Sequence, residues 1–295
     1  MNKNFISVIV TAYNRKQYLL DALKSAVNQT LPRDKYEIIV VKNFSDVKEI
    51  EDYIKKNNIR EINVKKKGVM YHIYGIRAAK GNILCFLEDD DLFTKDKLEF
   101  IYNNFKDDVV YIRNSYKTVN YKGEVIGGEF NRRIDFNASC ISIRKSVIDL
   151  RNLDLIKPYF GPDMFAFVSA VGKGKIIRVN KVLSLYRKHN EGVSASYSST
   201  EFKFINLLQK RAGILYKAYH RLHSESAKSI VRWMITENNI LLYMRGKHVK
   251  ITGLLNYLIH MKDMYGIWWT NFLAKRLILI LLFEFNRIKK YLAYR

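Results

Sequence analysis

Short apolar runs alternate with helical repeats over the first 115 residues of the chain. Residues 5–11, 36–41 and 83–87 are almost wholly apolar and rich in β-branched side chains, which is typical of strands buried on both faces of a sheet. Leucine and alanine recur at helical spacing over residues 18–27. This strand–helix–strand order predicts a parallel sheet with a right-handed crossover. The same reasoning predicts helices at 45–57, 71–79 and 95–105 and strands at 62–64 and 109–113.

The pattern changes after residue 115. Residues 116–147 alternate between apolar and polar positions and contain Gly123, Gly127 and Gly128, as antiparallel hairpins do. A helix is predicted at 164–171 and strands at 176–179 and 182–186, before a polar loop of small residues at 191–199. From residue 201 onward every segment has helical spacing. We therefore expect an α/β domain over residues 1–199 and a basic helical region over residues 200–295.

Four consecutive carboxylates follow the apolar run at 83–87. Glu88, Asp89, Asp90 and Asp91 repel one another strongly if they are even partly desolvated. Hard cations such as Mg2+ and Mn2+ take carboxylate ligands together with phosphate oxygens, and open α/β sheets bind ligands at the carboxyl ends of their strands. The run therefore predicts a metal–diphosphate site. The alternative is a solvated acidic loop that leads into the helix at 95–105.

The composition narrows the choice of partners. The chain has 295 residues, 48% of them hydrophobic, and a formal net charge of +23. That charge predicts attraction to phosphorylated substrates, anionic lipid or nucleic acid, but the sequence has no nucleic-acid-binding motif, so no nucleic acid partner is expected. Cys85 and Cys140 lie in apolar segments and are interpreted as buried thiols in a reducing compartment. No signal-peptide pattern precedes the first apolar run, which favours a cytoplasmic protein.

Several separate segments, in order, resemble the family 2 glycosyltransferases, whose catalytic domain has the GT-A fold. They are SVIVTAYNR at 7–15, SAVNQTLP at 25–32, EIIVV at 37–41, AAKGNILCFLEDDDLF at 78–93, GPD at 161–163 and YRKH at 186–189. The likeness covers about residues 5–195. It implies a mostly parallel sheet flanked by helices. It also implies transfer of a sugar from a nucleotide-diphosphate sugar to an acceptor hydroxyl, with inversion at the anomeric carbon.

The resemblance implies a nucleotide site at the ends of the first two strands. Thr11, Tyr13 and Asn14 match the family's first nucleotide-contacting turn, where backbone N–H groups can meet a ring or a phosphate. The alternative is a plain turn in which Asn14 caps the next helix. Asn43 stands where members often have an aspartate that contacts the base, and an amide can both donate to and accept from a uracil-like edge. Lys42 would add positive charge, and UDP or GDP is the expected nucleotide.

The resemblance also gives the acidic run a metal-binding role. Alignment on the preceding apolar strand favours Asp90 as the principal ligand of Mg2+ or Mn2+, with Asp91 as a further ligand or as a group that orients its neighbours. Glu88 or Asp89 would reach the ribose or a metal-bound water. His189, in the late basic segment, would complete the metal shell. The metal would offset charge on the leaving diphosphate.

Asp163 matches the acidic residue that the family uses as general base. Members commonly have Glu-Asp at this point, and here Pro162 replaces the first acid. Asp163 alone would then take the acceptor's proton, with a pKa raised by partial burial. The alternative is that Asp163 caps the helix that follows. Further basic candidates for contact with the diphosphate are Arg187, Arg77 and Lys80, whereas Lys188 is interpreted as surface charge.

Residues 200–295 lie outside the resemblance. Their strongest apolar stretch, 277–283, is too short to cross a bilayer, which takes about 20 residues. Trp268, Trp269 and Phe272 precede it and Lys and Arg flank it, which describes a helix lying in an anionic membrane interface. Helices packed on the catalytic domain, or a dimer interface, fit equally well. The family's frequent use of glycan or lipid-linked acceptors favours a peripheral position at the inner face of the cell membrane.

Two other functions stay open at this point. A nucleotidyltransferase acting on sugar phosphates would use the same strand-end carboxylates, but it normally has a glycine-rich basic loop after the first strand, and residues 11–16 contain no glycine. A non-catalytic protein that binds membrane or nucleic acid through its basic surface would leave the carboxylate run without a role. The sequence therefore predicts a metal-dependent glycosyltransferase.

Overall fold

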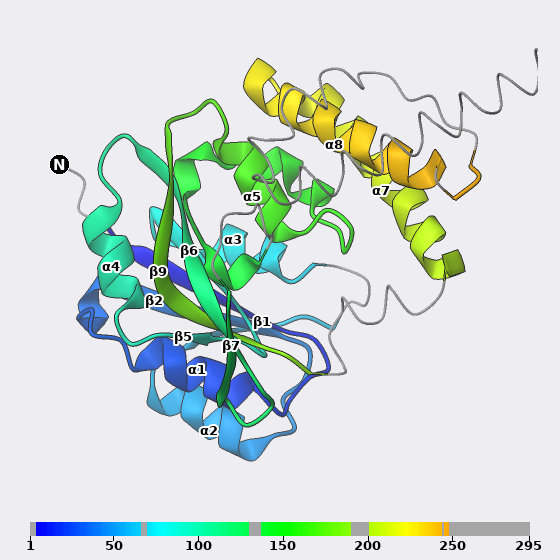
Figure 1. Cartoon of the computed structure of the whole chain (residues 1–295). Coiled ribbons are helices and arrows are strands. Elements are labelled where there is room, and N and C mark those ends of the chain that lie inside the picture. Colours follow the sequence, from blue (N-terminus) through cyan, green and yellow to red (C-terminus); the bar gives the residue numbers. More distant parts are fainter. Residues whose placement is uncertain (1–3, 66–69, 130–136, 190–200, 244, 248–295) are drawn as a thin grey trace, which may run out of the picture.

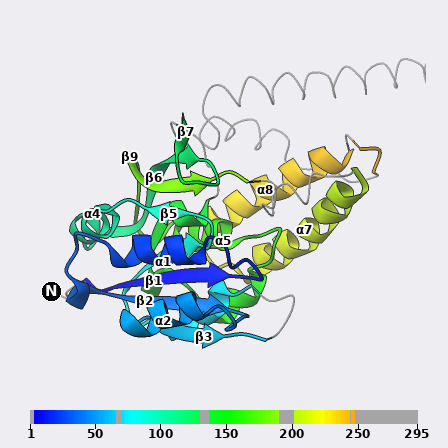
Figure 2. The same ribbon diagram turned by 90° about the horizontal axis from the view of Figure 1, so that it is seen from below.

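The computed structural model describes residues 4–65, 70–129, 137–189, 201–243 and 245–247. Over these residues a nine-stranded mixed sheet forms the centre of the molecule, in the order β3-β2-β1-β4-β8-β6-β9-β5, with β7 paired to β6. Helices cover both faces of the sheet, so the architecture has three layers (Figures 1 and 2).

The first part of the sheet is wholly parallel, as the apolar runs predict. β1 pairs with both β2 and β4, and β2 pairs with β3. The predicted helices and strands of this part form at the expected places, with small shifts of their ends. The elements are β1 (Ile6–Ala12), α1 (Leu19–Val27), η1 (Arg33–Lys35), β2 (Tyr36–Lys42), α2 (Lys48–Lys56), β3 (Arg60–Asn63), α3 (His72–Ala78) and β4 (Ile83–Glu88).

The second part of the sheet mixes strand directions. β8 is antiparallel to both β4 and β6, whereas β6 and β9 are parallel. The elements are β5 (Leu92–Phe93), α4 (Lys97–Asn104), β6 (Val109–Val119), β7 (Val125–Glu129), η2 (Ala138–Cys140), β8 (Ile141–Arg144), η3 (Lys145–Val147), η4 (Leu150–Leu155), α5 (Pro162–Ala170) and β9 (Lys175–Arg187). This alternation makes the sheet mixed rather than mostly parallel.

Two predictions for this part need correction, and one strand is missing from the predictions. The hairpins expected over 116–147 reduce, in the described residues, to the pair β6–β7, while β8 joins the central sheet. The two strands expected at 176–179 and 182–186 are one strand, β9, whose register against β6 shifts between residues 114 and 116. No pattern in the sequence predicts β5, because two residues are too few to show a period.

The apolar core lies on both faces of the sheet, because alternate strand residues point to opposite sides. Val8 and Val10 of β1 pack beneath α1, α2 and α4, whereas Ile9 packs beneath α3 and α5. Cys85 and Cys140 are buried free thiols, as predicted. The continuous apolar runs thus reflect strands covered by helices on both sides.

Two long helices follow the sheet, α7 (Glu201–Arg221) and α8 (Glu225–Tyr243). They lie side by side against α5 and η4, and their buried residues Leu215, Val231 and Met234 join the same core cluster as α5 (Figure 1). Asp154 of η4 also forms ion pairs of 2.6 Å with Lys217 and Arg221. The described part of the C-terminal region is therefore packed on the α/β domain. The apolar stretch at 277–283 lies outside the described residues.

Candidate active site

The acidic run lies at the carboxyl end of β4, in the middle of the sheet. Thr11 of β1 is in register with Glu88 of β4, and β2 ends beside β1 at Lys42. The N–H of Asp91 donates to the carbonyl of Glu88 (3.2 Å), so the chain turns tightly after the strand. The carboxylates therefore stand at the edge where β1, β2 and β4 end together, which is where open α/β sheets bind ligands.

Glu88 is held by side chains from two neighbouring elements. Its Oε1 lies 3.0 Å from Nε2 of His72 on α3, and Thr11 Oγ1 donates to its Oε2 at 3.1 Å. Burial alone would raise the pKa of Glu88, but His72, Thr11 and Arg15 outweigh burial, and the pKa lies below its ordinary value. Glu88 is thus a fixed, ionised acceptor. Sequence reasoning missed His72, because a lone histidine on the buried face of a helix looks like an ordinary core residue.

Arg15 joins the next two carboxylates. Its Nη2 lies 2.6 Å from Asp89 Oδ1, and its Nη1 lies 2.6 Å from Asp90 Oδ2. His189 Nε2 lies 2.9 Å from the same Asp90 oxygen and 3.2 Å from Arg15 Nη1. Burial raises the pKa of Asp89 well above its ordinary value, although Arg15 opposes the rise. The two predicted ligands Asp90 and His189 are therefore direct neighbours, and a guanidinium that the sequence did not single out lies between the carboxylates.

Asp91 lies beneath this turn. It is 2% exposed, and its Oδ1 accepts the backbone N–H of Arg187 at 3.0 Å. Burial, reinforced by the neighbouring charge of Asp90, raises the pKa of Asp91 to about 8. Because its carboxyl group is hydrogen-bonded to the backbone of β9, Asp91 orients the acidic turn. The geometry favours this orienting role over the predicted role of metal ligand.

A buried polar network supports the turn from below. Lys97 of α4 has no exposed surface, and its Nζ donates to the carbonyl of Ser139 and, at 3.0 Å, to Ser184 Oγ. Ser139 Oγ in turn accepts the N–H of Glu88 at 3.1 Å. Burial lowers the pKa of Lys97 to about 8. Side chains from α4, η2 and β9 thus fix the end of β4.

The predicted nucleotide residues meet at the ends of β1 and β2. Asn14 N donates to Asn43 Oδ1 (2.9 Å), and Asn43 Nδ2 donates to Asn14 Oδ1 (2.5 Å). Asn14 has a φ of 56°, a left-handed conformation that asparagine tolerates. It does not cap the next helix, whose N-cap residue is Tyr18. Tyr13 is 48% exposed beside this pair, with its ring edge-on to Tyr71.

Lys42 does not face this site, contrary to the prediction. Its side chain is fully buried, and its Nζ lies 2.7 Å from Glu51 and 2.8 Å from Glu61. The same Nζ donates to the carbonyl of Phe44 at 2.6 Å. Three oxygen partners satisfy the ammonium, so Lys42 stabilises the fold and offers no charge to a ligand.

Asp163 lies in the first turn of α5, near enough to Glu88 and His72 for their charges to affect its pKa. Helix α5 begins at Pro162 with Gly161 as its N-cap, so the alternative in which Asp163 is the cap is wrong. Asp163 Oδ1 accepts the N–H of Met164 at 2.8 Å, and it lies so close to Gly161 that a Cβ there would collide with it. Burial raises the pKa of Asp163 to about 6, and the charge of Glu88 adds to the rise.

Arg187 is a structural residue rather than a contact for the diphosphate. It is 2% exposed, its Nε donates to the carbonyl of Asp90 at 3.0 Å, and its Nη2 lies 3.2 Å from Asp21. The guanidinium also lies over the ring of Tyr18. Arg187 therefore links β9 to the acidic turn. The next residue, Lys188, is exposed.

The predicted contribution of Lys80 is wrong. Its N–H donates to Glu37, which also accepts from Ser7, at the amino end of β1 and β2. The carboxylates stand at the opposite end of these strands. Arg77 is exposed in the last turn of α3, which runs toward that same amino end.

The donor atoms suit a divalent cation that is shared with a substrate. Within the described residues, no group of three or more His, Cys, Asp or Glu side chains is arranged to hold a metal ion. Asp90 and His189 nevertheless bring one carboxylate oxygen and one imidazole nitrogen within 2.9 Å of each other. Mg2+ and Mn2+ are commonly held by one or two protein side chains plus diphosphate oxygens and water. The residues present thus fit a metal bound together with a nucleoside diphosphate.

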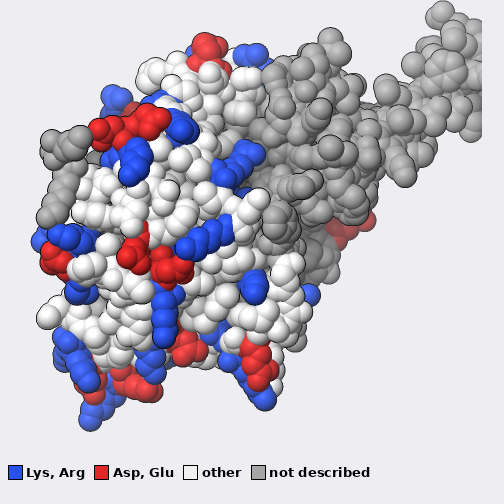
Figure 3. All heavy atoms as spheres, turned by 60° about the vertical axis from the view of Figure 1, so that its left-hand side comes forward, with Lys and Arg blue, Asp and Glu red and all other residues white. Residues whose placement is uncertain are grey.

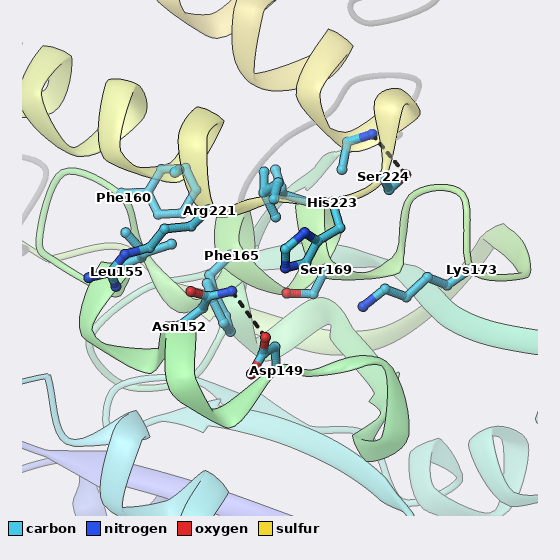
Figure 4. A pocket seen from close by; sticks show the side chains of 14 residues that line it. Asp149, Asn152, Leu155, Phe160, Phe165, Ser169, Lys173, Arg221, His223 and Ser224 are labelled. Atoms are coloured by element: carbon cyan, nitrogen blue, oxygen red, sulfur yellow. Dashed lines mark hydrogen bonds between the residues drawn. The ribbon is translucent and has the colours of Figure 1, made fainter.

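A separate hollow of about 100 Å³ lies between η4, α5 and the C-terminal helices (Figure 4). Phe160 and Phe165 line its apolar part, and none of the carboxylates of the acidic turn lines it. Two cations at its rim already have partners, since Arg221 pairs with Asp154 and Lys173 donates to a backbone carbonyl. This hollow is therefore distinct from the acidic site.

A protein-family model decides which family this fold and site represent. The model described as glycosyl transferase family 2 matches residues 7–167, more than half of the chain and the whole stretch from β1 into α5. The chain belongs to family 2 of the glycosyltransferases. The resemblance predicted from the sequence is confirmed, and the acidic turn and Asp163 both lie within the matched residues.

Relatives of this family 2 glycosyltransferase support the assignment. An uncharacterized glycosyltransferase of Rickettsia conorii is 34% identical over 135 residues, which are 43% of this chain and 21% of that protein. The chain thus spans only about a fifth of the length of that relative. The Escherichia coli protein WfaP, named as a UDP-Glc:α-D-GlcNAc-diphosphoundecaprenol β-1,3-glucosyltransferase, is 27% identical over 74% of this chain and 89% of its own.

Solved structures confirm the GT-A fold. Staphylococcus aureus TarS, residues 1–349 in complex with UDP-GlcNAc, superposes with a TM-score of 0.59 at 17% identity, covering 88% of this chain and 80% of that one. The mannosyltransferase PcManGT of Pyrobaculum calidifontis, in complex with GDP-Man and Mn2+, gives a TM-score of 0.54 at 14% identity, covering 92% and 84%. At these identities the likeness establishes the fold of the family 2 domain.

Proposed function

We propose that this chain transfers a sugar from a nucleotide-diphosphate sugar to an acceptor hydroxyl, with inversion at the anomeric carbon. The observation that carries the proposal is that two carboxyl groups from different parts of the fold lie near enough for the charge of Glu88 to raise the pKa of Asp163. Glu88 ends β4 as an ionised acceptor, and Asp163 lies in the first turn of α5 with a pKa raised to about 6 by burial and by Glu88. A carboxylate with that pKa is largely ionised at neutral pH and can still accept a proton.

In the proposed mechanism Asp163 takes the proton of the acceptor hydroxyl. The acceptor oxygen attacks the anomeric carbon of the donor sugar, and the bond from that carbon to the diphosphate breaks. Asp90 and His189 would hold Mg2+ or Mn2+, and the bound cation would offset negative charge on the leaving diphosphate. His72 and Thr11 fix Glu88, which would accept a hydrogen bond from the donor's ribose. Asp163 and the metal-binding pair thus serve opposite ends of one displacement.

The nucleotide would lie at the ends of β1 and β2. Tyr13 offers an exposed ring for contact with the base, and the linked amides Asn14 and Asn43 offer donors and acceptors to its edge. The donors named for the similar proteins carry uridine in WfaP and TarS and guanosine in PcManGT. We propose UDP or GDP as the nucleotide on this basis.

The acceptor is proposed to be a glycan or a lipid-linked sugar. WfaP, which aligns with most of this chain, is named for transfer to a sugar on diphosphoundecaprenol. Such an acceptor would bring the enzyme to a membrane surface, and the net charge of +23 favours an anionic one. No helix among the described residues is long and apolar enough to span a bilayer. The lipid-linked acceptor and the net charge together are the basis on which we propose contact at the membrane surface.

The alternative functions have less support. Basic side chains are interspersed with acidic ones on the face shown in Figure 3 and form no single basic patch there. A protein that binds polyanions through its surface charge would instead be expected to gather cations along one face. This chain lacks the glycine-rich loop that a nucleotidyltransferase normally has after its first strand, because Tyr13, Asn14 and Arg15 follow β1.

The first test is nucleotide binding by thermal stabilisation. Purified protein is heated with UDP, GDP, ADP or CDP, with and without Mn2+, as wild type and as Asp90→Ala. We expect UDP or GDP with Mn2+ to raise the melting temperature of the wild type, and the rise to be lost in Asp90→Ala. A folded wild type that responds to none of the four nucleotides would refute the proposed donor site. Hydrolysis of the matching nucleotide-sugar would then establish that the donor is cleaved, and a fall of about 10²–10⁴-fold in Asp163→Asn would support the role of Asp163 as base.

A further inference from the structure

Arg15 occupies the coordination space that a metal would need. Its Nη1 lies 2.6 Å from Asp90 Oδ2 and 3.2 Å from His189 Nε2, the two atoms that suit a divalent cation. To bind a metal, each of these two atoms must direct a lone pair of electrons at it. In the structure a lone pair of Asp90 Oδ2 is directed at the guanidinium of Arg15 instead. Arg15 and the metal therefore compete for the same atoms of the site.

The guanidinium is also well placed to hold this position. Arg15 is 18% exposed, and its second nitrogen, Nη2, lies 2.6 Å from Asp89, which is 1% exposed. The pair of contacts spans two adjacent carboxylates, a geometry that suits the planar fork of arginine. An arginine guanidinium is not deprotonated in proteins, so Arg15 keeps its positive charge at any pH at which the protein would be studied. Without another anion nearby, a divalent cation must displace a fixed positive charge.

A diphosphate changes this balance, because it offers Arg15 a new partner. Phosphate oxygens accept paired hydrogen bonds from a guanidinium as carboxylates do. A diphosphate bound beside Asp90 would draw Arg15 from Asp90, free the carboxylate oxygen, and supply further oxygen ligands to the cation. Each of these effects favours the metal only when the nucleotide is present.

We propose that Arg15 couples metal binding to nucleotide binding, by blocking Asp90 and His189 until a nucleoside diphosphate takes over its charge. The proposal rests on the proposed donor site. It predicts weak Mn2+ binding by the free protein and strong mutual enhancement of Mn2+ and nucleotide, since coupling between two ligands is reciprocal. Arg15 thereby also shields the carboxylates from one another while the site is free of ligand.

The test measures Mn2+ affinity directly, by the electron paramagnetic resonance signal of free Mn2+, without turnover. Wild type, Arg15→Gln and Lys16→Gln are titrated alone and with saturating UDP or GDP. Lys16→Gln is the matched control, since it removes one positive charge from the neighbouring position, where Lys16 pairs with the exposed Asp46. Circular dichroism and thermal unfolding establish that each variant is folded.

We expect Arg15→Gln to bind Mn2+ about tenfold more tightly than wild type in the absence of nucleotide, the size that Coulomb's law gives for a single and a double charge about 5 Å apart in water. The enhancement of Mn2+ affinity by nucleotide should shrink by a similar factor, and Lys16→Gln should behave as wild type. Arg15→Lys, which keeps the charge, should resemble wild type more closely than Arg15→Gln.

Two results would overturn the proposal in distinguishable ways. If wild type binds Mn2+ and nucleotide with strong mutual enhancement, and Arg15→Gln leaves the Mn2+ affinity of the free protein unchanged or weaker, the donor site stands and the coupling role of Arg15 is refuted. If wild type binds neither UDP nor GDP in the presence of Mn2+, the donor site itself fails and the proposal fails with it.

Discussion

Lys42→Met should unfold the protein at a markedly lower urea concentration. The Lys42 ammonium is fully buried and forms ion pairs with Glu51 and Glu61, whose side chains are 17% and 30% exposed. Removing one partner of a buried ion pair costs about 3–5 kcal/mol, chiefly because the other charge is left without compensation. Since water reaches both glutamates, we expect the lower end, about 3 kcal/mol. With a urea dependence of about 3 kcal/mol per molar, the midpoint should fall by about 1 M.

Two comparisons make this prediction sharp. Lys16→Met removes a lysine from an exposed pair with Asp46 and should cost less than about 1 kcal/mol. Adding Glu51→Gln and Glu61→Gln to Lys42→Met should recover most of the loss, because no uncompensated charge is left. Stabilisation by UDP or GDP with Mn2+ should persist in Lys42→Met. A midpoint within about 0.3 M of wild type, or selective loss of the nucleotide effect, would refute the structural role of Lys42.

Three further predictions concern the site itself. Turnover should fall about tenfold between pH 7 and pH 5, because the pKa of Asp163 is about 6, and Asp163→Asn should lower it about 10²–10⁴-fold; a pH-independent rate would contradict this. With a chelator present to keep the protein free of metal, the stability of Asp91→Asn to urea should rise relative to that of wild type as the pH rises from 5 to 9. The reason is that the folded pKa of about 8 exceeds the unfolded value near 3.9, so over most of this range the folded wild type holds a proton that the unfolded chain has released, and its stability falls as the pH rises. Equal differences in urea midpoint between the two proteins at both pH values would disprove this. Tyr13→Ala should weaken nucleotide binding about tenfold by calorimetry, as loss of a ring contact predicts, and Tyr216→Ala on α7, also an exposed tyrosine, should not.

The sequence predicts the first part of the fold well, because its strands are covered on both faces. Their apolar runs are long enough to identify β1, β2 and β4 almost to the residue. The second part is harder, because β8 and β5 are short and β9 is irregular against β6. Strand partners there depend on contacts between distant residues, which no local period records.

The candidate site shows the same division. The carboxylates, Asp163 and His189 could be chosen from local motifs that recur in the family. Lys42 could not be interpreted correctly, because its position at a strand end gives no information about Glu61 on the neighbouring strand. Arg15 was missed for a related reason, since its contact with His189 joins residues 174 positions apart. Charge in the sequence indicates that a partner exists, and only the fold indicates which one.

The seam between β4 and β8 has a consequence for how such enzymes diversify. The proposed nucleotide and metal residues mostly precede or border this seam, whereas Asp163 follows it. Only three residue pairs join the two strands, Ile83 with Arg144, Leu84 with Ile143 and Cys85 with Ser142. A recombined gene that keeps these pairs in register could inherit one donor and a different acceptor. A slip of one residue would turn every β8 side chain to the other face of the sheet. It would thereby displace Asp163, the proposed general base, from the bound donor sugar.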